Sequence, residues 1–167
     1  PERFADDVSA LARRLEAVVE GRFVPREARH LTLAFLGDVP EADALVAADA
    51  LEAACAGVPR IPLRAAGLGT FGRQDDATLW LGIARSPELE HLAARLREEL
   101  AARELSFDGK PFKPHVTLAR RARIPRGNLP PLPFPLADQA ETATLFKSTL
   151  RRDGAAYEPL RSVRLVG

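Results

Sequence analysis

Cysteine and histidine are scarce in this chain of 167 residues, and methionine is absent. The single cysteine, Cys55, excludes an internal disulfide framework and favours a reducing compartment, so we expect a cytoplasmic protein. No apolar run approaches the roughly 20 residues that a membrane-spanning helix needs, so we expect no membrane contact. Because the chain contains no methionine, we also expect that residues precede Pro1.

Charge of one sign is not in excess either. The formal net charge is +1, so the average charge identifies no partner and only local clusters can do so. Arginine outnumbers lysine and alanine is abundant, which is typical of a GC-rich bacterial genome. A chain of this length suits one domain, or two small lobes that share a core. We expect a single, monomeric domain over residues 1–167 that folds without disulfide bonds.

Apolar residues at helical spacing predict helices over residues 4–20, 41–56 and 88–105. Gly21 and Gly57 should end the first two, since glycine is common just beyond a helix. Ser86 should cap the third, with Pro87 at its first position.

Alternating stretches predict strands at "RHLTLAFLG", "ATLWLGIA" and "KPHVTLAR". The stretch "IPLRAAGLGTFG" predicts a strand that runs into a glycine-rich turn, and "IPRGNLPPLPFPL" predicts a proline-rich loop. Asp153-Gly154 predicts a hairpin between two final strands. Helices interspersed with hairpin-like strand pairs favour an α+β fold.

Two strands carry the same motif, His-x-Thr-Leu, and use two of the three histidines. Because side chains alternate along a strand, His30 and Thr32 should share one face, while Leu31, Leu33 and Phe35 face the core. His115 and Thr117 repeat this arrangement. If both strands border one groove, two imidazoles and two hydroxyls surround one space.

Such a space suits a phosphodiester. Two histidines can act as general base and general acid in one displacement, and threonine hydroxyls can donate hydrogen bonds to phosphate oxygens. The second motif also lies in a stretch, residues 109–137, that has six lysines and arginines and no acid. Positive charge there favours a polyanion, although a solvated basic rim would have the same composition.

Other polar features predict no site of their own. His91 should be an ordinary residue on a helix surface, and Cys55 should pack among alanines. The histidines lack the spacing of metal ligands, and no acid lies beside either motif, so we expect neither a metal nor a cofactor. Gly67, Gly69 and Gly72 lack the ending of a phosphate-binding loop, which favours a turn.

At these residues the chain resembles a known family. "RFVPREARHLTLAFLGDVP" and "FDGKPFKPHVTLAR" resemble the two signatures of the 2H phosphoesterase superfamily, and in particular the RNA 2′,3′-cyclic phosphodiesterases, also called 2′-5′ RNA ligase-like proteins. The resemblance implies two lobes related by a pseudo-twofold, with antiparallel sheets, helices outside and a cleft between them. It also implies a short strand ahead of the first helix, which this chain would lack.

The resemblance implies metal-independent opening of RNA 2′,3′-cyclic phosphates, or of cyclic nucleotides, to 2′-phosphates. His30 and His115 match the catalytic histidines, Thr32 and Thr117 the phosphate-binding hydroxyls, and Arg120 a phosphate-binding arginine. A straight strand would turn Arg120 away from His115, so a bulge or a strand end must redirect it.

The roles of the two histidines rest on local charge. Positive neighbours favour a neutral ring, which indicates His115 as the proton acceptor and His30 as the proton donor. Phe112 is a candidate platform for the base, with a core position as the alternative. Joining of RNA ends through a 2′-5′ linkage, and RNA-end binding without catalysis, remain alternatives.

Overall fold

The computed structural model describes all of residues 1–167 and has three α-helices and eight strands in an α+β arrangement. The chain divides into two compact units. The first unit comprises Pro1–Leu31, Leu63–Ala84 and Pro114–Asp138. The second comprises Thr32–Pro62, Arg85–Lys113 and Gln139–Gly167. Both units are therefore built from segments that are distant in the sequence.

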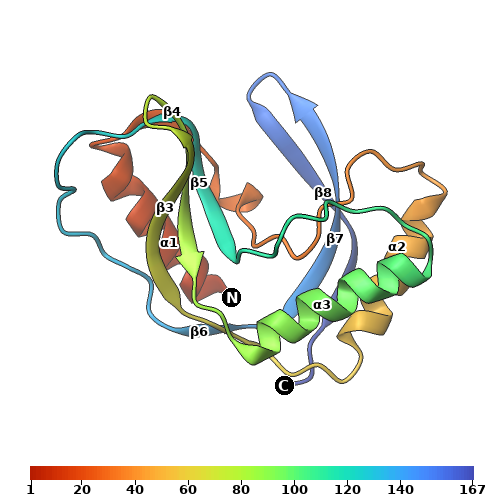
Figure 1. The fold of residues 1–167 in the computed structure, drawn as a ribbon. Helices are drawn as coiled ribbons and strands as arrows, with labels where there is room; N and C mark the ends of the chain where they lie inside the picture. The colour runs from red at the N-terminus through yellow and green to blue at the C-terminus, as the bar shows by residue number, and fades with distance from the viewer. The chain divides into compact units, whose positions relative to one another are not determined.

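The first unit is a four-stranded antiparallel sheet with one helix. The strand order is β1 (Glu20–Phe23), β5 (His115–Arg123), β4 (Asp76–Ile83) and β3 (Ala65–Arg73). Helix α1 (Glu2–Glu16) lies along one face of this sheet (Figure 1). It buries Phe4, Val8, Leu11 and Leu15, which recur at helical spacing. A short 3₁₀ helix, η1 (Arg26–Ala28), follows β1.

Alternation along β4 separates the two faces of the sheet. Ala77, Leu79, Leu81 and Ile83 are buried on the face that forms the core. Thr78 and Trp80 are half-buried and point to the other face, as period-two geometry requires. We call this second face the site face.

The second unit packs two helices against a long hairpin. Helix α2 (Asp43–Cys55) contacts α3 (Pro87–Ala102) and the strands β7 (Thr142–Arg151) and β8 (Gly154–Arg164). Strand β2 (Ile61–Leu63) pairs with β6 (Asp138–Ala140) in a separate two-stranded sheet. In β7 and β8, Arg151 pairs with Gly154, whose φ is +125°. The predicted hairpin is therefore confirmed, with Arg152 and Asp153 in the turn and Gly154 as the first residue of β8.

The three helices are confirmed, but all of them end earlier than predicted, α2 by a single residue. The cap of α3 is confirmed, since the Ser86 hydroxyl accepts a hydrogen bond from the Leu89 amide at 3.2 Å. Helix α1 ends at Glu16 because residues 20–23 pair with β5 as a strand. Gly21 lies inside that strand, and a Cβ there would lie 2.9 Å from the Cα of Ala122. This glycine therefore permits close strand packing and is not the predicted helix stop.

The strand predicted over residues 29–37 is wrong. Only Leu31 pairs, in an isolated antiparallel bridge to Val116, and the chain then leaves the sheet. Phe35, predicted to face the core, is 61% exposed, and its carbonyl accepts a hydrogen bond from the Asp108 amide at 2.8 Å. Alternation predicts burial only where the segment forms a strand with one face packed on a core, and residues 32–37 form no strand.

The glycine-rich turn predicted at residues 67–72 is also wrong. Gly67, Gly69 and Gly72 lie within β3, which pairs with β4 as far as Arg73. Gly67 and Gly72 have φ of +82° and +86°, so they supply local kinks without ending the strand.

Cys55 generates a prediction about stability and pH. It is buried, and burial raises the pKa of its thiol although nearby Arg95 acts in the opposite direction. The raised pKa means that the folded state retains the proton where the unfolded chain loses it. The contribution of Cys55 to the free energy of unfolding should therefore be fully present below the ordinary thiol pKa of about 8.5, and it should decline as the pH rises above that value. Urea unfolding of wild type and Cys55→Ala between pH 7 and 10 tests this prediction. The free energy of unfolding should fall more steeply with pH in wild type, and an equal fall in the two proteins would contradict the prediction.

Candidate active site

Strand β5 places the second motif on the site face. Thr117 pairs with Trp80 and His115 pairs with Gly82, so both side chains emerge beside the even-numbered residues of β4. Val116 and Leu118 point into the core. The predicted sharing of one face by His115 and Thr117 is therefore confirmed.

A β-bulge adds Arg120 to the same face. Thr117 pairs with Trp80, whereas Ala119 pairs with Leu79, so β5 has one extra residue at this point. Leu118 and Ala119 are consecutive, and both are 0% exposed. The extra residue reverses the alternation, which brings the exposed Arg120 to the face of Thr117. The bulge that Arg120 needs in order to share a face with His115 is therefore present.

A second irregularity follows at Arg121, which has a positive φ of 48°. Ala122 then returns to the core at 0% exposure. Across the sheet, Arg22 of β1 pairs directly with Arg120. Two exposed like charges opposite each other repel, so this pair favours an anion between or above them. Sequence patterns do not identify Arg22, because the spacing of residues 4–20 predicts a helix that runs almost up to it.

His30 is held at the edge of this sheet. Leu31 pairs antiparallel with Val116, and this register puts residue 30 opposite residue 117. His30 Nδ1 lies 2.9 Å from the Ala28 carbonyl oxygen, which can only accept a hydrogen bond. Nδ1 therefore carries a proton, and Nε2 is the nitrogen at which His30 would exchange one.

Arg29 anchors the segment that carries His30. Its Nε donates to the Val24 carbonyl at 3.1 Å, and its Nη1 donates to the Ser9 hydroxyl of α1 at 2.7 Å. Burial lowers the pKa of the Arg29 guanidinium, with nearby Arg26 the next cause in the same direction. These two hydrogen bonds attach the segment just before His30 to the end of β1 and to helix α1.

Two aromatic rings lie beside His115. Its imidazole lies 5.3 Å from the Phe71 ring, nearly perpendicular at 88°, and 5.7 Å from the Trp80 ring. Gly69 pairs with Trp80, and a Cβ on Gly69 would lie 2.1 Å from a Trp80 ring atom. Trp80 therefore lies flat over a strand position that only glycine can occupy.

The remaining predicted residues belong to the second unit. Thr32 is exposed, and Phe112 is half-buried with a carbonyl that accepts a hydrogen bond from Arg85 Nη2 at 2.8 Å. Their roles stay predictions. The first unit alone brings together His30, His115, Thr117 and Arg120.

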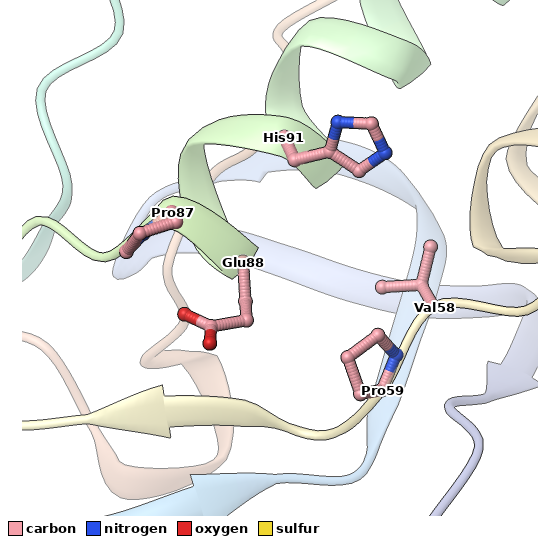
Figure 2. A pocket seen from close by; sticks show the side chains of 5 residues that line it. All are labelled: Val58, Pro59, Pro87, Glu88 and His91. Carbon is pink, nitrogen blue, oxygen red and sulfur yellow. The ribbon is translucent and has the colours of Figure 1, made fainter.

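Two hollows lie elsewhere in the units. His91, exposed on α3 as predicted, borders one of about 390 Å³ with Glu88, Pro87, Val58 and Pro59 (Figure 2). The other, of about 650 Å³ in the first unit, is bordered by Arg123, the last residue of β5, and by Arg126. No three His, Cys, Asp or Glu side chains cluster as metal ligands would. None of the three helices could span a lipid bilayer.

Solved structures with this fold include phosphoesterases. The crystal structure of TT0787 of Thermus thermophilus matches with a TM-score of 0.81 and 29% identity, covering 99% of this chain and 93% of that one. E. coli LigT complexed with 3′-AMP matches with a TM-score of 0.78 and 28% identity, covering 98% of this chain and 93% of that one. The α+β fold with antiparallel sheets and three helices is thus that of the LigT-type 2H phosphoesterases.

Sequence comparison agrees with the fold. Residues 2–127 match the family described as the 2′-5′ RNA ligase superfamily, and the chain belongs to this family. A relative from Thermus thermophilus, named RNA 2′,3′-cyclic phosphodiesterase, is 37% identical over 86% of this chain and 75% of its own length. A relative of the same name from Geobacillus stearothermophilus is 35% identical over 74% of this chain, which spans only 39% of that relative's length.

The contact between Gly69 and Trp80 generates a prediction. Gly69→Ala should lower turnover about tenfold or more, because the new Cβ would displace Trp80 from beside His115. Gly109→Ala is the matched control, since a Cβ there meets nothing within 4 Å. Steady-state kinetics on a 2′,3′-cyclic nucleotide, with thermal unfolding alongside, would measure both. Equal turnover in the two variants would show that Trp80 does not need this glycine.

Proposed function

We propose that this chain hydrolyses RNA 2′,3′-cyclic phosphate ends, and 2′,3′-cyclic nucleotides, to 2′-phosphomonoesters without a metal ion. The observation that carries the proposal is the bulge in β5, which aligns Arg120 with His115 and Thr117. The relatives named RNA 2′,3′-cyclic phosphodiesterase support the same substrate class.

The face suits an in-line displacement at phosphorus. Thr117 would donate a hydrogen bond to a non-bridging phosphate oxygen, and Arg120 would bind the phosphate with Arg22 adding positive charge. Charge that builds on the phosphate oxygens in the transition state is stabilised best by donors that are already in place. Thr32, which occupies the matching place in the first motif, is the proposed second hydroxyl.

Each histidine has one proton to move. His115, in the basic stretch, would take a proton from the attacking water, whose oxygen forms the new bond to phosphorus. The bond from phosphorus to the 3′ oxygen breaks, and His30 would give its Nε2 proton to that oxygen. The product retains the phosphate on the 2′ oxygen, and exchange of protons with solvent restores both rings.

The histidine pair generates the central prediction. His30→Ala and His115→Ala should each reduce hydrolysis on the order of 10²–10⁴-fold, the usual contribution of a positioned proton-transfer group. The rate should be bell-shaped against pH because one ring must be charged and the other neutral. Steady-state kinetics on cyclic nucleotides would measure it, and near-normal rates in either variant would refute the two-histidine mechanism.

A nitrophenyl phosphodiester separates the two roles. Its leaving group needs no proton, so loss of the acid should matter much less than loss of the base. His30→Ala should therefore retain most activity on this substrate, whereas His115→Ala should not. The opposite result would reverse the assignment.

Two arginines should behave differently. Arg120→Ala should lower kcat/KM for cyclic nucleotides about 10–100-fold, because a charged hydrogen-bond donor to phosphate is lost. Arg126→Ala, at the hollow beyond β5, should mainly reduce the salt dependence of binding to longer RNA. Kinetics on mononucleotides and salt titrations with an oligonucleotide distinguish the two, and negligible effects from both would make the basic stretch ordinary surface.

A further inference from the structure

The two histidines of the repeated motif are held in different ways. His115 lies on β5, which pairs with β4 on one side and with β1 on the other. After His30 the chain makes only the isolated bridge at Leu31 before it leaves the sheet. A group that transfers a proton needs a defined direction, because a displacement of about 1 Å can lower a rate about 100-fold. His30 therefore needs an anchor that its own strand pairing does not supply.

The side chain of Arg29 supplies an anchor in two directions. Its Nε donates to the Val24 carbonyl, directly after β1, at 3.1 Å, and its Nη1 donates to the Ser9 hydroxyl of α1 at 2.7 Å. The Val24 amide in turn donates to the Leu118 carbonyl of β5 at 2.8 Å. A chain of hydrogen bonds thus links the residue before His30 to the strand that carries the second motif.

The peptide group between Ala28 and Arg29 connects this anchor to the imidazole. Its carbonyl oxygen lies 2.9 Å from His30 Nδ1, and its amide donates to the Arg26 carbonyl at 3.2 Å. Arg29 has an extended backbone, with φ of −76° and ψ of 134°, at the point where η1 ends. An anchored Arg29 side chain therefore restricts the orientation of this peptide, and the peptide determines which ring nitrogen carries the proton.

We propose that Arg29 is the positioning residue of the proton donor: its two side-chain hydrogen bonds keep the Ala28 carbonyl aimed at His30 Nδ1, which leaves Nε2 for proton transfer. The role of His30 as donor rests on the proposed function, whereas the orientation of its ring does not. The planar fork of the guanidinium is what this task requires. Lysine would retain the charge, but its single ammonium on a flexible chain does not reproduce the two fixed directions.

Nitrogen-15 NMR of the histidine rings tests the anchor without a substrate. The chain has three histidines, and the signals missing from His30→Ala assign the ring. Where this ring is neutral, wild type should show a protonated Nδ1 and an unprotonated Nε2. Arg29→Lys should show a mixture of both tautomers, because the hydrogen bond that selects one of them is loosened. A ring that stays protonated at Nδ1 in this variant would overturn the inference.

Kinetics with two leaving groups show whether Arg29 acts through His30. Arg29→Lys should lower kcat on a 2′,3′-cyclic nucleotide about 10–100-fold with little change in KM. On a nitrophenyl phosphodiester, whose leaving group needs no proton, the same variant should stay close to wild type. Arg29→Lys should also add nothing to the loss caused by His30→Ala. Equal losses on the two substrates, no loss on either, or losses that add to those of His30→Ala would each contradict the positioning role.

Arg95→Lys is the matched control. Arg95 is also half-buried, and it donates two side-chain hydrogen bonds to carbonyls of another element, to Ala53 at 2.8 Å and to Ala56 at 3.1 Å. This variant should lose thermal stability as Arg29→Lys does, yet retain the His30 tautomer and the ratio of the two rates. A change in either would show that general loosening of the fold is sufficient.

Ser9→Ala keeps the test decisive if Arg29→Lys does not fold. It removes one of the two hydrogen bonds of Arg29 at a helix position that favours alanine, so it should change the tautomer and the rate ratio in the same direction but less. A changed tautomer in a protein that does not hydrolyse cyclic nucleotides would support the anchor and refute the proposed function. Normal hydrolysis with an unchanged tautomer in both variants would overturn the anchor alone.

Discussion

The extra residue in β5 is the feature on which the proposed chemistry depends. In a regular strand, a side chain five positions from His115 would point into the core, and an arginine there would be buried without a partner. The bulge between Thr117 and Ala119 instead puts two small or apolar side chains in succession into the core. Arg120 then emerges on the face of the motif. A local disruption of the hydrogen-bond ladder thus places the Arg120 guanidinium on the same face as the Thr117 hydroxyl and the His115 imidazole.

A second constraint comes from glycine in β3. Gly69 leaves room for Trp80 to lie across the strand, and the indole in turn borders His115 and Phe71. The imidazole is therefore packed against rings on a sheet instead of standing on a mobile loop. Such packing restricts the orientation of the imidazole that we propose as a proton acceptor. The charged pair Arg22 and Arg120 adds the repulsion that a bound phosphate would relieve.

Much of the local structure follows from sequence patterns alone. The three helices, the cap at Ser86, the hairpin at residues 153–154 and the strand of the second motif were all predictable, because each depends on residues close together in the chain. The first motif was not, since its strand would need a partner along its whole length and has one only at Leu31. Residues 20–23 became a strand through pairing with a segment almost 100 positions away, which no local spacing reveals.

The sequence by itself therefore determined the chemistry that is present: two histidines in a repeated motif, two threonines, and a stretch rich in arginine. Only the tertiary structure decided which of these groups share a face. Strand register, bulges and the glycine beneath Trp80 set that arrangement, and each depends on contacts between distant segments. Side-chain direction in a sheet reverses with a shift of one residue, so a motif can specify the groups of a site without specifying their geometry.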